Sequence, residues 1–199
     1  MKYCWLDCET TGLNPVKNGL VSLAYIIEDE EGNILLKKNL KIQPFMTDEI
    51  CQEALNVNGF DVLDFSGFMN PCNVAFEFVN DLLPYITDNE RLTLCGYNVM
   101  FDYKFVKEFL RKCEEFRIMN NVSNDAIIQI QDLFEWYQLD IYIVTHFLSY
   151  CGIPFEEGRR LENVCKKFDV KIIPHDAMSD IEATRELGHI YKKAFLRKE

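Results

Sequence analysis

The chain has 199 residues, 48% of them hydrophobic, and carries a formal net charge of −11 at pH 7. This length predicts a single domain spanning residues 1–199. The negative charge argues against a broad DNA-binding surface built from basic side chains, although it leaves open a local site where bound cations supply the positive charge.

The first sixty residues are predicted to form three strands and a helix. Apolar and aromatic runs predict strands at 2–7, 20–28 and 34–42, and the DEEGN stretch between the last two predicts a hairpin turn. Thr47 or Asp48 can cap a helix that continues to Val57, where Asn58-Gly59 stops it. Residues 60–73 have no regular pattern.

Helices and strands alternate over the rest of the chain. The predicted elements are, in order, a helix at 73–83, a strand at 92–95, a helix at 99–116, a strand at 134–139, and helices at 141–150, 161–168 and 176–196. No element is assigned to residues 117–131. The buried stripe expected for the first of these helices is Phe76, Val79, Leu82 and Leu83. Three antiparallel strands followed by alternating helices and strands indicate an α/β fold with a mixed sheet.

Two acids lie at the end of the first predicted strand. In WLDCETTGL (residues 5–13), Asp7 and Glu9 alternate with Cys8, so both acids project from one face of the strand. Acids at a strand end commonly begin a turn. Here, however, the two acids directly continue an apolar strand. Because both negative charges point in the same direction, their placement requires an explanation.

Two further acids lie on the apolar stripes of predicted helices. Asp102 precedes the stripe Phe105, Val106, Phe109 and Leu110. Asp180 precedes the stripe Ala183, Thr184, Leu187, Ile190, Tyr191 and Ala194, and the residues expected to face solvent on that final helix are Glu182, Arg185, Glu186, His189, Lys192 and Lys193. A cap or rim position is the ordinary explanation for one acid at a helix start. Ionised carboxylates on a core-facing stripe are costly unless something pairs with them.

The four acids all end or begin elements that can meet at one edge of an α/β sheet. Such a group repels itself unless cations neutralise it. Hard oxygen ligands in this number favour Mg²⁺ or Mn²⁺ over zinc. His175, which follows Pro174, is by itself an ordinary loop histidine, and His146 and His189 are expected to face solvent and are assigned no role.

Three motifs in order resemble the DEDDh family of 3′–5′ exonucleases, which includes the proofreading epsilon subunit of bacterial DNA polymerase III. DCETTGL at 7–13 matches the first motif, DxExTGL. Asn98, Phe101 and Asp102 match the second, and His175 with Asp180 matches the third, His-x4-Asp. The resemblance extends to the segment 54–59 and to Asp140, which begins a helix in many members. Tyr97 departs from the histidine that many members have, which leaves the subgroup open.

The resemblance implies a ribonuclease-H-like mixed sheet, three antiparallel strands plus two parallel, flanked by helices. It also implies two Mg²⁺ or Mn²⁺ ions held by Asp7, Glu9, Asp102 and Asp180, with Asp7 contacting both ions and His175 acting as general base. The substrate-binding residues that it implies are Thr10, Thr11, Gly12, Leu13, Phe60, Asn98 and Phe101.

The implied function is hydrolysis of phosphodiester bonds at the 3′ ends of single-stranded or frayed DNA, in proofreading or repair. An RNA 3′ exonuclease on the same fold is the nearest alternative, and a non-catalytic domain that binds nucleic acid or a polymerase is another. The expected partners are single-stranded 3′ ends and a DNA polymerase. Basic residues at 159, 160, 166 and 167 are candidates for phosphate contacts, although such a charge run is commonly a solvated face.

The predicted cellular location is the cytoplasm. The eight cysteines form no CxxC pair, whereas disulfide-stabilised chains are usually much shorter and zinc sites usually contain close ligand pairs. Apolar runs are far shorter than the roughly 20 residues that cross a bilayer, and the N-terminus does not resemble a signal peptide. These features predict reduced thiols and no membrane association.

Overall fold

The computed structural model describes residues 1–87, 89–120 and 129–196. Five strands form one sheet: β1 (Tyr3–Thr10), β2 (Leu20–Glu28), β3 (Ile34–Lys41), β4 (Leu92–Gly96) and β5 (Phe134–Asp140). Their order is β3-β2-β1-β4-β5. The first three strands pair antiparallel, whereas β4 and β5 run parallel to β1, so the predicted fold class and mixed sheet are confirmed.

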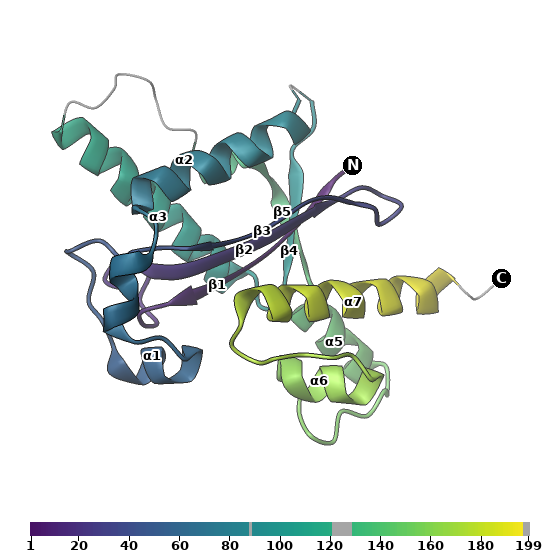
Figure 1. The fold of residues 1–199 in the computed structure, drawn as a ribbon. Helices are drawn as coiled ribbons and strands as arrows, with labels where there is room; N and C mark the ends of the chain where they lie inside the picture. Colours follow the sequence, from purple (N-terminus) through teal and green to yellow (C-terminus); the bar gives the residue numbers. More distant parts are fainter. Residues whose placement is uncertain (88, 121–128, 197–199) are drawn as a thin grey trace.

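Helices cover both faces of the sheet (Figure 1). On one face lie α2 (Pro71–Leu82) and α3 (Met100–Met119), which pack on the β1 side chains Cys4, Leu6 and Cys8. On the other face lie α5 (Ile141–Tyr150), α6 (Leu161–Phe168) and α7 (Ala177–Leu196), which pack around Trp5. Because side chains alternate along a strand, Asp7 and Glu9 share the face of Trp5 and lie on the α7 side.

The helix predicted from residue 47 begins later than expected. The helix α1 spans Gln52–Asn58, because Asp48 does not cap it. The Asp48 carboxylate instead accepts a hydrogen bond from Phe45 N and forms a nearly buried ion pair with Lys112 on α3. The C-terminal stop is as predicted, since Gly59 adopts a left-handed conformation with φ of 71°. The segment predicted to be irregular contains a short 3₁₀ helix, Val62–Gly67.

The stripe predicted for α2 is only half right, since Leu82 and Val79 pack on the core, whereas Phe76 and Leu83 are exposed. The helix starts at Pro71, capped by the Asn70 side chain, and a second 3₁₀ turn, Leu83–Tyr85, follows it. Its buried face includes Val74, Ala75, Phe78 and Leu82, whereas Phe76 is 71% exposed. The remaining predicted helices and strands agree within a few residues at each end. In the segment 117–131, α3 extends to Met119 and α4 (Ile130–Leu133) begins; residues 121–128 lie outside the described part.

The prediction that Arg185 and His189 on α7 face solvent is also wrong. Arg185 Nε lies 2.5 Å from Glu28 Oε2 and His189 Nε2 lies 3.0 Å from the same oxygen. Glu28 is only 3% exposed, so its carboxylate needs these partners. The arrangement fixes α7 against β2. Among the described helices, none is both long and apolar enough to cross a membrane.

The ends of β1 and β4 explain how distant acids reach one place. β4 pairs with β1 only as far as Trp5, and the chain then leaves the sheet at Gly96. A Cβ atom at Gly96 would lie 2.9 Å from the Leu6 carbonyl oxygen, so glycine permits this close approach. The helix α3 starts directly after this turn and brings Asp102 beside the tip of β1. The helix α7 packs along β1 and brings Asp180 to the same tip.

Candidate active site

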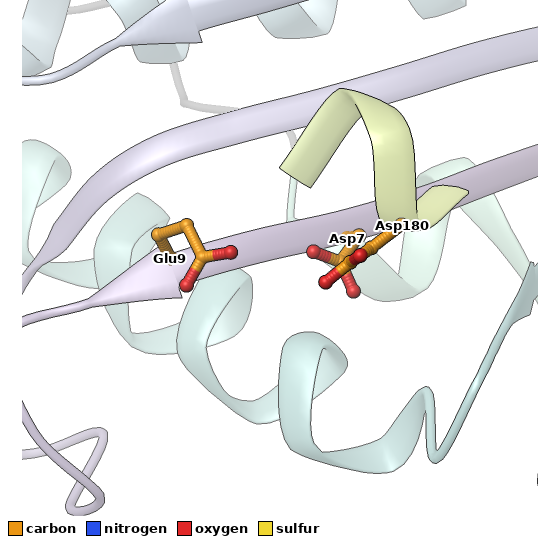
Figure 2. Close-up of side chains that lie close together, drawn as sticks. All are labelled: Asp7, Glu9 and Asp180. Carbon is orange, nitrogen blue, oxygen red and sulfur yellow. The ribbon is translucent and has the colours of Figure 1, made fainter. Parts of the chain in front are cut away.

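Three carboxylates from two elements meet at the tip of β1. Asp7 and Glu9 come from β1 and Asp180 from the first turn of α7 (Figure 2). One oxygen of each lies within 4.8 Å of the others. The structure thus brings together acids that are separated by more than 170 residues in the chain, as the sequence predicts.

Asp102 lies beside this group without joining it. Its side chain is 4% exposed, and Oδ1 accepts hydrogen bonds from Cys8 N at 3.0 Å and Cys8 Sγ at 3.1 Å. Burial and, after it, the charge of Asp102 nevertheless raise the pKa of Asp7, so the two carboxylates interact. The predicted buried stripe of α3, from Phe105 to Leu110, is confirmed.

Burial and mutual repulsion disfavour the ionised form of these acids. Burial, followed by the charges of Asp180 and Asp102, raises the pKa of Glu9 to about 8. Burial also raises the pKa of Asp102 and of Asp180 to about 7 each, and burial with neighbouring acids raises the pKa of Asp7. Lys41 opposes the shift of Glu9 but does not cancel it.

The donor set fits a hard divalent cation. All three clustered groups offer carboxylate oxygens, which are the ligands that Mg²⁺ and Mn²⁺ prefer. Asp180 Oδ1 is buried and has no hydrogen-bond partner among the described residues. A buried carboxylate oxygen without a partner is costly, and a cation between these groups would remove that cost together with their repulsion.

His175 lies in the turn before α7. It has a left-handed backbone, with φ of 63°, and its N–H donates to Asp180 Oδ2 at 3.2 Å. The ring is about half exposed, and Nε2 lies 3.8 Å from Glu162 Oε1 on α6. The structure therefore holds His175 and Asp180 together as the third motif predicts. Glu162 beside the ring is an additional acid that sequence reasoning missed.

The residues after β1 divide into buried and exposed positions. The Thr10 and Thr11 hydroxyls are buried and donate to the carbonyls of Gly12 and Glu49, so both are occupied within the protein. Gly12 lies against Asn18, where a Cβ atom would be 2.5 Å from the amide group. Leu13 is 84% exposed and is the side chain of this group that is free to meet a ligand.

The other predicted substrate residues lie on either side of β1. Phe60 is half-buried, packs on Phe68, and has Lys41 Nζ 4.7 Å from its ring centroid. Phe101 is half-buried and packs on Phe105. Asn98 has a left-handed backbone and donates from its N–H to Asp140, which caps α5 as its position predicts.

A cleft of about 640 Å³ opens beside His175 and Asp180. It lies between α5, α6 and the start of α7, and its lining includes Asn98, Tyr142, His146, Arg159 and Arg160. His146 is half-buried here, contrary to expectation, since it accepts a hydrogen bond from Arg159 Nε and packs edge-on against Tyr142. Tyr142 and His146 are four residues apart on one helix, and this spacing could have predicted that both side chains line the cleft.

The position that departs from the family pattern also borders this cleft. Tyr97 donates its hydroxyl hydrogen to the Arg159 carbonyl and packs edge-on against Tyr142. Of the predicted basic run, Lys166 pairs with Glu157 and Lys167 lies over Phe155, away from the cleft. The two arginines are therefore better placed than the two lysines to meet a substrate.

Solved structures establish the class of fold. Escherichia coli exonuclease I in complex with a dT13 oligonucleotide superposes with a TM-score of 0.77 at 19% identity, over 98% of this chain and 42% of that chain. The zinc-bound form of the exonuclease I–single-stranded DNA complex gives a TM-score of 0.77 at 20% identity, over 98% and 41%. This chain thus spans about two fifths of exonuclease I. The architecture is the ribonuclease-H-like fold of exonucleases.

Sequence comparisons give the family. The RNase_T model, described as exonuclease, matches residues 4–187. An oligoribonuclease of Neisseria meningitidis serogroup C is 23% identical over 97% of this chain and 91% of the relative. An oligoribonuclease of Haemophilus influenzae is 21% identical over 97% and 94%. The chain belongs to the RNase_T exonuclease family and is a 3′–5′ exonuclease. The finer resemblance to the polymerase epsilon subunit stays a prediction.

The raised pKa values predict an unusual pH dependence of stability. The native protein keeps protons on Glu9 and Asp180 up to pH values of about 8 and 7, whereas an unfolded chain loses them near 4.5 and 3.8. Unfolding therefore releases protons, and the metal-free protein should become less stable as the pH rises from 6 to 8. Thermal unfolding of chelator-treated protein at both pH values measures this loss.

Mg²⁺ should reverse the loss at pH 8 more strongly than at pH 6, where protons compete for the same oxygens. At 100 times its dissociation constant a ligand adds about 2.7 kcal/mol, which in a chain of this size corresponds to a shift in Tm of about 5–10 °C. Sodium chloride at equal ionic strength is the control, because general screening also stabilises a chain of charge −11. Equal shifts with both salts would contradict a specific cation site.

Proposed function

We propose that the protein removes nucleotides from the 3′ ends of single-stranded or frayed DNA with the help of two Mg²⁺ or Mn²⁺ ions. The observation that carries this proposal is the convergence of Asp7, Glu9 and Asp180 within 4.8 Å around a buried oxygen that finds no hydrogen-bond partner in the described part of the chain. Asp102, which stands behind them, completes the proposed ligand set. Bound ions would supply an activated water and neutralise the charge that develops on the phosphate and the leaving oxygen.

Side chains of the protein itself would position the reacting groups and deprotonate the attacking water. His175 would accept the proton of the attacking water, since its backbone N–H is tied to Asp180 and its ring borders the cleft. Its accessible ring suits this task because a general base must exchange its proton with solvent after each turnover. The carboxylates of Asp7 and Glu9 would orient the reacting groups from one face of β1.

Substrate binding would use surfaces on both sides of the acids. Leu13 would pack on the terminal base and Phe60 would support it, because an apolar contact to a base does not depend on sequence. Asn98 and Phe101 would border the same pocket. Arg159 and Arg160 would meet backbone phosphates, which gives an acidic protein a local positive surface where the strand lies.

DNA is favoured by the likeness of nearly the whole chain to exonuclease I structures that contain dT13 or other single-stranded DNA. Short RNA is the second candidate, and the observation that favours it is the match to curated oligoribonucleases over 91% of their length. The 2′-hydroxyl decides between the two substrates. A DNA polymerase partner and a cytoplasmic location remain part of the proposal, the latter supported by eight free thiols.

A parallel degradation assay tests the proposal. Single-stranded DNA and RNA of one sequence, labelled at the 5′ end, are incubated with the protein and Mg²⁺, and product lengths are followed in time. We expect stepwise shortening of the DNA from its 3′ end that stops on chelation, and faster turnover of DNA than of RNA. Faster turnover of RNA would replace the proposed substrate, and no Mg²⁺-dependent shortening of either would overturn the proposal.

A further inference from the structure

Cys8 lies between the two acids of the first motif but points away from them. It is 6% exposed and packs with the α2–α3 core, on the face of β1 opposite to Asp7 and Glu9. From there both of its donors reach one atom: the backbone N–H lies 3.0 Å and Sγ lies 3.1 Å from Asp102 Oδ1. A single residue of β1 thus holds one oxygen of a carboxylate from α3.

The sheet creates the need for this contact. β4 pairs with β1 only through Trp5, so beyond that residue no strand within residues 1–87, 89–120 and 129–196 pairs with this edge of β1. Past the end of this pairing, the Asp102 carboxylate accepts the Cys8 N–H, which a buried backbone donor needs. The thiol then adds a second donor to the same oxygen, which the backbone alone would not supply.

We propose that Cys8 is a positioning residue: its N–H and thiol together hold Asp102 Oδ1 and thereby present Oδ2 to the divalent cation. The inference rests on the proposed function, since it assumes that Asp102 takes part in binding the cation. A carboxylate that is hydrogen-bonded through one oxygen has a fixed orientation, and such outer contacts set how well a metal site is formed. The thiol makes this contact specific to the side chain at position 8.

Cys4 provides a matched comparison. It lies on the same face of β1, four residues earlier, and is fully buried in the same core. Its Sγ makes no hydrogen bond to another described residue. Cys4→Ala and Cys8→Ala therefore remove the same atom from the same core, but only the second removes a donor from Asp102. A purely structural role of the thiol would affect both variants alike.

The experiment measures Mg²⁺ binding by the shift of thermal unfolding as Mg²⁺ is titrated, on the full chain without substrate. For Cys8→Ala we expect the Mg²⁺ midpoint to rise about 10-fold, the lower end of the loss typical of removed outer contacts to metal ligands. Cys4→Ala should keep the wild-type midpoint. Cys8→Ser, whose hydroxyl can still donate to Asp102, should restore most of the affinity. The Mg²⁺ dependence of exonuclease rate should follow the same order.

Cys8→Val fills the space of the thiol without a donor and serves if the alanine variant does not fold. The inference is overturned if Cys8→Val and Cys8→Ala show the same Mg²⁺ midpoint as Cys4→Ala. That result differs from failure of the proposed function, in which the wild-type protein itself shows neither Mg²⁺-dependent stabilisation nor hydrolysis of DNA or RNA.

Discussion

Asp180→Asn is expected to lower the exonuclease rate by at least about 10³-fold, because the charge stabilisation that a metal ion gives to a transition state is worth several kcal/mol. Asparagine has the shape of aspartate and keeps an oxygen that can accept the His175 N–H. It removes a negative charge and one buried oxygen that has no partner among the described residues. The rate loss should therefore come with a metal-free Tm that equals or exceeds that of the wild type.

Asp176→Asn is the matched control for this variant. Asp176 lies one turn earlier and its charge also raises the pKa of Asp180, but it caps the helix by accepting the Ser179 N–H and is not one of the three clustered carboxylates. Asparagine caps helices as well as aspartate does. A large loss of rate in both variants would mean that negative charge in general is required. Loss of the folded state in Asp180→Asn would show that Asp180 is required for the fold.

His175→Asn is expected to lower the rate by about 10²–10⁴-fold, the usual contribution of a general base. Asparagine suits this position because it tolerates the left-handed backbone that His175 adopts, so the turn should persist. His175→Ala should give a similar loss. The measurement is the rate at saturating substrate and Mg²⁺ across a range of pH.

A separate readout distinguishes His175 from the acids that are proposed to bind metal. Since His175 is not among the clustered carboxylates, Mg²⁺ should stabilise His175→Asn against heat as strongly as it stabilises the wild type, whereas Asp180→Asn should lose that stabilisation. The pH profile of the His175→Asn rate should also lose the part that reflects deprotonation of a general base. An unchanged rate would remove His175 from the mechanism, and lost Mg²⁺ stabilisation would assign it a role in binding.

Much of the site follows from local pattern. Asp7 and Glu9 share a face because strand side chains alternate, and the core-facing stripe of α3 carries Asp102 inward because helical spacing repeats every three to four residues. Both inferences need only neighbouring residues, and both agree with the structure. The three motifs in order were likewise sufficient to predict the exonuclease family that residues 4–187 match.

The errors arise where one side chain is claimed by a distant element. Asp48 does not cap α1 because Lys112 of α3 holds it, and His189 is only 24% exposed because Glu28 of β2 binds it. The prediction for α2 is wrong at Phe76 because this helix packs on the sheet through the face around Phe78. No local sequence pattern records where the sheet lies.

The amino-acid sequence by itself therefore determined the order of elements, the mixed sheet and the acids that belong together, because each depends on periodicity or on motif spacing. Only the tertiary structure decided that Asp102 stands apart from the other three acids on two Cys8 donors, that Glu162 flanks His175, and that α5 and α6 build a cleft with Arg159. These contacts join residues separated by 13 to 94 positions, and their distances depend on how the helices pack on the sheet.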